Sequence, residues 1–226
     1  MVGRFKAVVS DVDGTITDGH KHIQCRGIEA LRQAQERGLN VMLASGNVLP
    51  VAYGLSAFIG LRGPVIAENG GMVCYQDRIY QLQSGDLPER AFLELERSMP
   101  GTKRLFTDNW RTTEVGLRRD QDLNQVQEAL AGWDLEIEAT GFAIHIMEKG
   151  HSKMKGVLKA CELLGISPAE VVAFGDADND VKMLEGCGYG IAVANASPAA
   201  KAAAKYVSKA NQAEGVVEGL IMLDLL

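Results

Sequence analysis

The sequence has no long hydrophobic run. No stretch reaches the roughly 18 apolar residues that a membrane-spanning helix needs. The segment before Asp11 is too short to be a secretory signal peptide. We therefore expect a cytoplasmic protein with no membrane partner.

Positive charge is also scarce. The 226 residues include 23 lysines and arginines against 29 aspartates and glutamates, which gives a net charge of −6. The basic residues form no cluster or stripe, and this argues against nucleic acid or an anionic membrane as the main partner. A small ligand is favoured instead.

Metal-binding and nucleophilic patterns built on cysteine or histidine are missing as well. The four cysteines are isolated from one another and show no Cys-x-x-Cys spacing, so neither a zinc site nor a disulfide framework is indicated. The four histidines are unclustered, and they indicate no Ser/His/Asp triad. Any catalytic chemistry must come from other residues.

Aspartates in two short loops supply that chemistry. Asp11 and Asp13 follow an apolar run over residues 5–9, and Asp176 and Asp180 follow another over residues 171–174. Each run is typical of a buried strand, which puts the carboxylates where a parallel sheet meets solvent. Adjoining carboxylates repel by about 4 kcal/mol per pair at 4 Å and an effective dielectric of 20. A divalent cation relieves this repulsion, and oxygen ligands favour Mg²⁺ over zinc.

Strand and helix patterns alternate before residue 68 and again from residue 153. Such alternation predicts right-handed βαβ units around a parallel sheet, an α/β, Rossmann-like core. The predicted strands span residues 5–9, 39–44, 65–67, 171–174, 190–193 and 206–207, with a hairpin over 72–75 and 79–82. The predicted helices span residues 27–37, 49–59, 153–164, 180–184, 198–204 and 215–225.

A different pattern interrupts this alternation. Linker-like residues at 84–88 and at Gly150 enclose predicted helices over 89–98 and 122–130 and strands over 113–117, 135–139 and 142–147. This set is typical of a small α+β unit inserted into the first. We therefore predict a catalytic core over residues 1–83 and 152–226, and an inserted domain over residues 84–151.

The ordered motifs resemble the haloacid dehalogenase superfamily of phosphatases. Residues 11–15 are similar to its first motif, 43–46 to its second, Lys153 to its third and 175–180 to its fourth. Residues 68–71 and 194–196 resemble subclass IIB, which carries a cap between the second and third motifs. The resemblance implies that the inserted unit is such a cap, and that it selects the substrate.

The resemblance also implies residue roles. Asp11 would attack phosphorus, and Asp13 would protonate the leaving group and then deprotonate the hydrolytic water. Lys153 would neutralise developing charge and orient Asp11. Lys155 is the competing lysine, but the spacing from Lys153 to residues 164–165 fits the family pattern better. Mg²⁺ would be held by Asp11, the main-chain carbonyl of Asp13 and Asp176, with Asp180 at the ion or just behind it.

Substrate contacts are expected from the second motif and beyond it. Many capped relatives have Arg or Lys directly after the Ser-Gly pair of the second motif. This chain has Asn47 at that position, after Ser45 and Gly46, so one cationic contact to substrate is absent. Residues 45–50 and 108–111 resemble the archaeal phosphoglycolate phosphatases of the superfamily. A small, doubly anionic substrate needs a cation from the cap, which Arg111 or Arg118 could supply; alternatively, Arg111 is a solvated surface charge. The expected substrate-binding residues are Ser45, Gly46, Asn47, Lys153, Asn195 and Arg111.

The expected activity is Mg²⁺-dependent hydrolysis of 2-phosphoglycolate to glycolate and phosphate through an aspartyl-phosphate. A sugar-phosphate phosphatase or a phosphotransferase would use the same residues. A receiver-type signalling module also carries a phospho-accepting aspartate, but it is shorter and lacks an inserted unit. We expect a small phosphorylated metabolite as partner, and a monomer or homodimer.

Overall fold

The computed structural model describes residues 3–226. Met1 and Val2, the first residues of the predicted core, lie outside the described residues. The core sheet contains β1 (Ala7–Asp11), β2 (Asn40–Ala44), β3 (Val65–Ala67), β4 (Met72–Tyr75), β5 (Arg78–Gln81), β9 (Val171–Gly175), β10 (Tyr189–Ala192) and β11 (Tyr206–Val207). Their order is β11-β10-β9-β1-β2-β3-β4-β5. The strands from β11 to β3 run parallel, and β4 and β5 complete one edge as an antiparallel hairpin.

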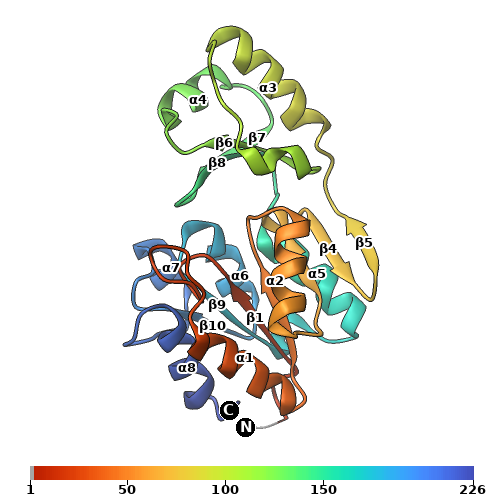
Figure 1. Cartoon of the computed structure of the whole chain (residues 1–226), viewed down its shortest axis with the longest axis vertical. Coiled ribbons are helices and arrows are strands. Elements are labelled where there is room, and N and C mark those ends of the chain that lie inside the picture. The colour runs from red at the N-terminus through yellow and green to blue at the C-terminus, as the bar shows by residue number, and fades with distance from the viewer. Residues whose placement is uncertain (1–2) are drawn as a thin grey trace.

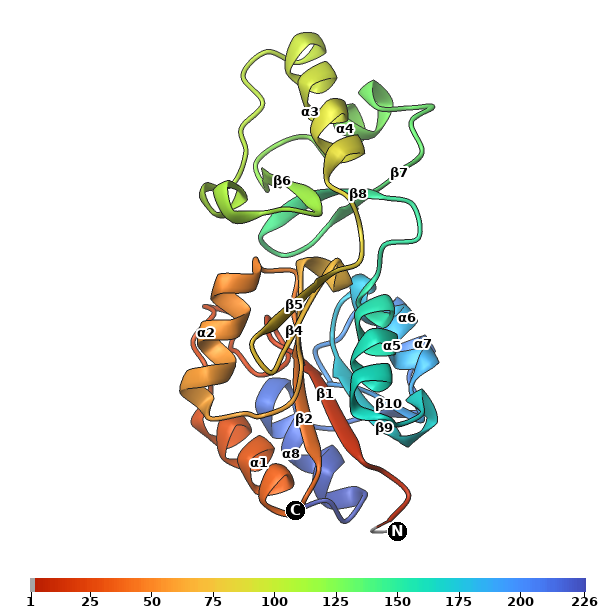
Figure 2. The same cartoon turned by 90° about the vertical axis from the view of Figure 1, so that its right-hand side faces the viewer.

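Helices cover both faces of this sheet (Figure 2). One face carries α1 (Cys25–Glu36), α2 (Leu49–Ile59) and α8 (Gln212–Met222), and the other carries α5 (Lys153–Leu164), α6 (Val181–Gly186) and α7 (Pro198–Ala203). Side chains of β1 alternate between the two layers: Val8 joins the cluster under α1 and α8, while Val9 joins the cluster under α5 and α6. Burial on both faces explains why the parallel strands are apolar throughout.

A smaller α+β unit lies between β5 and α5 in the chain. It contains α3 (Asp86–Ser98), β6 (Glu114–Arg118), α4 (Leu123–Ala129), β7 (Leu135–Ala139) and β8 (Ala143–Glu148), and its antiparallel sheet has the order β6-β8-β7. Leu95 of α3 and Ile146 of β8 belong to a separate apolar cluster within this unit. The unit stands over the carboxyl ends of the core strands as a cap (Figure 1).

The predicted fold class is confirmed, and the elements occur in the predicted order. One difference concerns α8, which begins at Gln212 rather than at residue 215. The first backbone N–H groups of this helix are satisfied from distant loops: Gln212 N donates to Asn195 Oδ1 at 2.7 Å, and Ala213 N donates to Gln24 Oε1 at 3.1 Å. Local sequence does not show such partners. A 3₁₀ helix over Phe106–Trp110 was also not predicted.

Within residues 3–226, no helix is both long enough and apolar enough to cross a membrane.

Candidate active site

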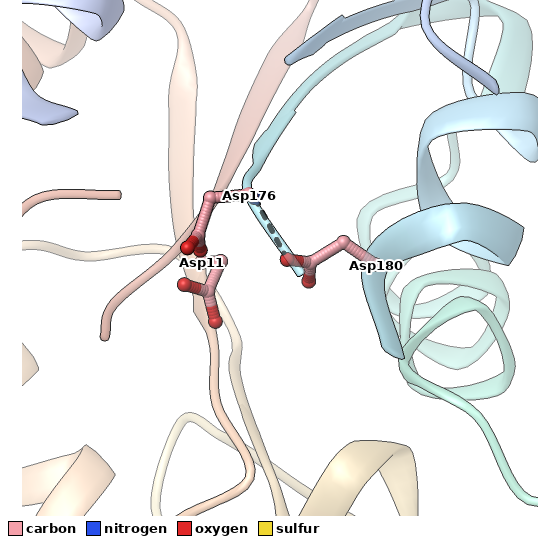
Figure 3. Close-up of side chains that lie close together, drawn as sticks. All are labelled: Asp11, Asp176 and Asp180. Atoms are coloured by element: carbon pink, nitrogen blue, oxygen red, sulfur yellow. Dashed lines mark hydrogen bonds between the residues drawn. The ribbon is translucent and has the colours of Figure 1, made fainter. Parts of the chain in front are cut away.

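Parallel pairing brings the motif loops together at one edge of the sheet. Asp11 is in register with Ala44 of β2, and Ser10 is in register with Phe174 of β9. The loops that follow these strands therefore lie side by side. In Figure 3 the carboxylates of Asp11, Asp176 and Asp180 gather at this point, and one oxygen from each lies within 4.8 Å of the others.

Lys153, the first residue of α5, lies between two of these carboxylates. Its Nζ donates to Asp11 Oδ1 at 2.5 Å and to Asp180 Oδ1 at 2.7 Å, and its side chain is 1% exposed. Burial by itself lowers the pKa of Lys153, but the two carboxylates outweigh it and raise the pKa above its ordinary value. The two carboxylates therefore favour the charged form of Lys153. Lys155, the competing lysine, instead donates to Gln83 Oε1.

Burial also affects the acid at the end of β1. It raises the pKa of Asp11 well above its ordinary value; Lys153 opposes this shift, whereas Asp180 and Asp176 add to it. The Oδ2 atom of Asp11 is buried, and no group in residues 3–226 hydrogen-bonds to it. One oxygen of Asp11 is thus fixed by an ammonium group, and the other is free to react or to bind an ion.

Hydrogen bonds fix the loop after β9. Asp180 Oδ2 accepts from the N–H groups of Asp176 and Ala177, each at 3.0 Å, and Thr15 Oγ1 donates to Asp176 Oδ1 at 3.0 Å. Burial, with Asp180 adding to it, raises the pKa of Asp176 to about 6. Gly14 has a φ of +87°, and a Cβ at this position would overlap the Asp176 carboxylate. Glycine is therefore required where the two loops approach.

The donor set fits a hard divalent cation. Asp11, Asp176 and Asp180 offer only carboxylate oxygens, and the free Oδ2 of Asp11 lacks the partner that a buried oxygen needs. Both oxygens of Asp180 already accept hydrogen bonds, which agrees with a place at the ion or just behind it. The contact of the Asp13 main-chain carbonyl with Mg²⁺ stays a prediction.

The side chain of Asp13 belongs to a separate pair of contacts. Asn47 Nδ2 donates to Asp13 Oδ2 at 2.9 Å, and Lys21 Nζ lies 3.2 Å from Asp13 Oδ1. Asn47 N in turn donates to Ser45 Oγ at 3.0 Å. Asn47 therefore positions the predicted acid and base, and Ser45 is buried beside it.

Two more of the predicted substrate-binding residues, Asn195 and Arg111, make contacts with other protein groups. Asn195 donates from Nδ2 to Gly14 O at 2.9 Å and accepts from Gln212 N, so it braces the first loop from outside. Arg111 is 1% exposed and pairs with Glu114 and Asp108 inside the cap. Burial lowers the pKa of the Arg111 guanidinium, and the neighbouring carboxylates oppose this.

A cavity of about 230 Å³ lies above the carboxylates. Asp11, Asp13 and Gly46 line it from the core, and Gly141 and Phe142, at the turn between β7 and β8, line it from the cap. A neighbouring cavity of about 190 Å³ shares Lys153 and Asn179 with it. Within residues 3–226, Arg111 and Arg118 line neither cavity. Arg111 instead pairs with Glu114 and Asp108, and Arg118 pairs with Asp120, so the contact of a cap arginine with substrate stays a prediction that these ion pairs do not support.

A sequence model of haloacid dehalogenase-like hydrolases matches residues 8–99 and 117–220, a span that includes every motif loop described above. The chain belongs to the haloacid dehalogenase-like hydrolases. The resemblance inferred from the motifs is thereby confirmed, and the chain is a hydrolase rather than a receiver-type signalling module.

Similar members of the haloacid dehalogenase-like hydrolases are known from archaeal genera. A phosphoglycolate phosphatase of Methanothermobacter thermautotrophicus is 38% identical over 216 residues, which cover 96% of this chain and 97% of the relative. A phosphoglycolate phosphatase of Methanopyrus kandleri is 39% identical, with coverage of 92% and 93%. The crystal structure of Thermoplasma acidophilum 0175 matches with a TM-score of 0.91 and 30% identity, covering 98% of this chain and 99% of that chain. A sugar phosphatase of HAD subclass IIB shares the fold, with a TM-score of 0.82, 21% identity and coverage of 98% and 100%.

Glu68 and Asn69 join the cap to the hydrolase core, a role that the sequence pattern did not indicate. Asn69 donates from Nδ2 to Glu114 Oε2 and accepts at Oδ1 from Asn179 Nδ2, both at 3.0 Å. Glu68 Oε2 accepts from the hydroxyl of Thr113 at 2.7 Å. Both Glu68 and Asn69 adopt a left-handed backbone, with φ near +50°. The motif at residues 68–71 signalled the subgroup, but it did not reveal that one buried asparagine bridges the cap and the fourth motif.

Proposed function

We propose that this chain is a Mg²⁺-dependent phosphatase that hydrolyses 2-phosphoglycolate through an aspartyl-phosphate at Asp11. The observation that carries the proposal is the buried Lys153, which holds one oxygen of Asp11 while the other stays without a partner. A nucleophilic carboxylate needs this arrangement, because its orientation must be fixed while one lone pair remains free to attack.

The first half of the reaction transfers the phosphoryl group. An oxygen of Asp11 attacks phosphorus, the ester P–O bond breaks, and the leaving oxygen takes a proton from Asp13. Asn47 holds Asp13 at 2.9 Å and fixes the direction of this proton transfer. Lys153 balances the charge of Asp11 and Asp180 throughout.

The second half regenerates the enzyme. Asp13, now a carboxylate, accepts a proton from water as that water attacks phosphorus, and the bond to Asp11 breaks to release phosphate. A divalent cation held by Asp11, Asp176 and the main-chain carbonyl of Asp13, with Asp180 at or behind it, would supply positive charge beside the phosphoryl oxygens. We assign donation to the same oxygens to Ser45 and to the backbone at Gly46, which lines the cavity.

The size of the cavity supports a small substrate. About 230 Å³ lies between the carboxylates and the cap, and the neighbouring cavity adds about 190 Å³, which together suit a small phosphorylated metabolite. Relatives at 38% and 39% identity are named phosphoglycolate phosphatase. The names of these relatives favour 2-phosphoglycolate over a sugar phosphate.

We also propose separate roles for the core and the cap. We assign catalysis to residues 1–83 and 152–226, and substrate selection to the cap over residues 84–151. Gly141 and Phe142 support this assignment because they cover the cavity from the cap side. Closure of such a cap over the substrate excludes water from the reacting groups.

Phosphate release tests the proposal. The substrates are 2-phosphoglycolate, ethyl phosphate, a hexose 6-phosphate and a nucleoside monophosphate, each with Mg²⁺ and with EDTA; the Asp11→Asn variant controls for contaminating phosphatases. We expect kcat/KM for 2-phosphoglycolate to exceed the others by at least about tenfold, a difference of about 1.4 kcal/mol, and EDTA to abolish it. Preference for the hexose phosphate would retain the mechanism and replace the substrate. Activity unaffected by EDTA would contradict the metal assignment.

A further inference from the structure

Besides its phosphate group, the proposed substrate carries a second anionic group, a carboxylate, that the catalytic groups do not neutralise. In 2-phosphoglycolate a single methylene separates the ester oxygen from the carboxylate. When the phosphoryl group faces Asp11 and the ester oxygen faces Asp13, the carboxylate therefore lies in the same cavity, beside Asp13. A carboxylate removed from water at this point requires a cationic hydrogen-bond donor.

Two lysines supply the positive charge along the cavity over Asp11. Among the described residues that line it, the basic side chains are those of Lys153 and Lys21. Lys153 is buried, and its ammonium is already shared by Asp11 and Asp180. The side chain of Lys21 is 54% exposed, so its ammonium can still donate a hydrogen bond to a further partner.

Lys21 lies beside the predicted proton donor. Its Nζ is 3.2 Å from Asp13 Oδ1, while Asn47 occupies Asp13 Oδ2. It also lies 4.0 Å from the centre of the Phe142 ring, a favourable cation–π distance, and Phe142 belongs to the cap. The ammonium group is thus held between the core acid and the cap turn, where the carboxylate of the leaving group would lie.

The backbone before Lys21 is built to present this side chain. Thr17 and Ile23 pair across the loop, Lys21 N donates to Asp18 O at 3.0 Å, and Asp18 Oδ1 accepts from His20 N at 2.8 Å. Lys21 adopts a φ of +66°. A lysine in this region is strained, and strained residues held by their surroundings concentrate at functional sites.

We propose that Lys21 recognises the carboxylate of the substrate, and so makes the active site selective for phosphate esters of small hydroxy acids. The inference rests on the proposed function. The ammonium of Lys21 then bridges the substrate carboxylate and Asp13. The cap contributes Phe142 to this contact, whereas the cation itself comes from the core.

The test compares two substrates on variants of the full chain with Mg²⁺ supplied. Ethyl phosphate replaces the carboxylate of 2-phosphoglycolate by a methyl group and keeps the rest of the chain. We expect Lys21→Met to lower kcat/KM for 2-phosphoglycolate by about tenfold to thirtyfold, mostly through KM, as loss of one charged hydrogen bond at a half-exposed position implies. Ethyl phosphate loses only the effect of the contact between Lys21 and Asp13, so its kcat/KM should fall less, within about threefold. Lys21→Arg should retain most of the preference.

Lys6→Met is the matched control. Lys6 also pairs with a carboxylate, Glu170, at 2.7 Å, and its side chain is 52% exposed, but it lies at the opposite end of β1. This variant should leave both substrates unaffected. Equal losses on both substrates for Lys21→Met, or no loss, would overturn the assignment of Lys21 while the preference of the unaltered enzyme still supports the proposed function. If the unaltered enzyme does not prefer 2-phosphoglycolate to ethyl phosphate, the proposed substrate and the role of Lys21 are both wrong.

Discussion

Replacing Lys153 by methionine removes the ammonium group that lies between two buried carboxylates. The side chain of Lys153 is 1% exposed, and those of Asp11 and Asp180 are 6% and 0% exposed. Methionine keeps most of the length of the side chain and removes its charge. We expect the free energy of unfolding to fall by about 3–5 kcal/mol at pH 8, the usual cost of leaving buried charges without their partner. Phosphatase activity should be lost as well.

The size of the loss should depend on pH. Without Lys153, the carboxylates within 4.8 Å of one another repel by roughly 3–4 kcal/mol per pair at an effective dielectric of about 20. Lys153 now opposes the rise in the pKa of Asp11, so its removal raises that pKa further. A carboxylate with a raised pKa takes up a proton in the folded state as the pH falls, which removes the repulsion. The deficit of the variant should therefore shrink between pH 8 and pH 5.

Urea unfolding in EDTA, followed by far-UV circular dichroism at pH 8 and pH 5, measures this deficit. Lys155→Met is the matched control, since Lys155 lies on the same helix and contacts the uncharged Gln83. Adding Asp180→Asn to Lys153→Met should recover part of the stability, because one unpaired charge is removed. Equal losses of stability in the two lysine variants, or a deficit of Lys153→Met that is independent of pH, would show that Lys153 does not stabilise the protein by pairing with these carboxylates.

Four further substitutions of single residues give testable predictions. Asp11→Asn should abolish phosphate release with an unchanged circular dichroism spectrum, and Asp13→Asn should lower kcat by about 10²–10⁴-fold; appreciable turnover by Asp11→Asn would contradict the covalent mechanism. Gly14→Ala forces a side chain to a φ of +87° and into the carboxylate of Asp176, so a Mg²⁺ titration of activity should show weaker metal binding and about a hundredfold lower kcat/KM. Burial lowers the pKa of His145 to about 3 in the folded protein, whereas the pKa of an unfolded histidine is about 6.5. Below about pH 6.5 the unfolded chain therefore binds a proton that the folded chain does not, and the free energy of unfolding falls as the pH drops. His145→Gln should therefore reduce the slope of unfolding free energy against pH between pH 7 and 5 by up to about 1.4 kcal/mol per unit, measured by urea unfolding; an unchanged slope would contradict the burial of a neutral histidine.

The fold was predictable because its signals are local. Apolar runs such as residues 5–9 and 171–174 mark buried strands, and the aspartates after them mark the carboxyl ends of those strands. Parallel pairing then requires Asp11 and Asp176 to lie side by side, as they do. The choice of Lys153 over Lys155 also agrees with the structure, since only the first of these lysines contacts the carboxylates.

The surroundings of the candidate cations were not predictable in this way. Arg111 was expected to offer a free charge, but Glu114 and Asp108 neutralise it once β6 and the preceding turn pack together. Lys21 carries no motif, and its place beside Asp13 depends on a left-handed backbone and on a cap turn more than a hundred residues further along the chain. Both outcomes arise from tertiary packing, which the pattern of residue types does not encode locally.

Asn69 shows the same limit in a buried residue. Its side chain connects Glu114 of the cap with Asn179 of the fourth motif. The sequence marks residues 68–71 only as a motif of the subclass. Because the three side chains come from distant segments, their contact is visible only in the folded chain.

Trapping the aspartyl-phosphate is the direct test of phosphoryl transfer to Asp11. The Asp13→Asn variant is mixed with Mg²⁺ and an aryl phosphate, whose phenolate leaves without a proton from residue 13, and is then quenched in acid within one turnover, digested and analysed by mass spectrometry. We expect a phosphoryl group on the peptide that contains Asp11, which accumulates because this variant lacks the base that activates water. A phosphoryl group on another residue, or none on this peptide while phosphate is still released, would contradict phosphoryl transfer to Asp11.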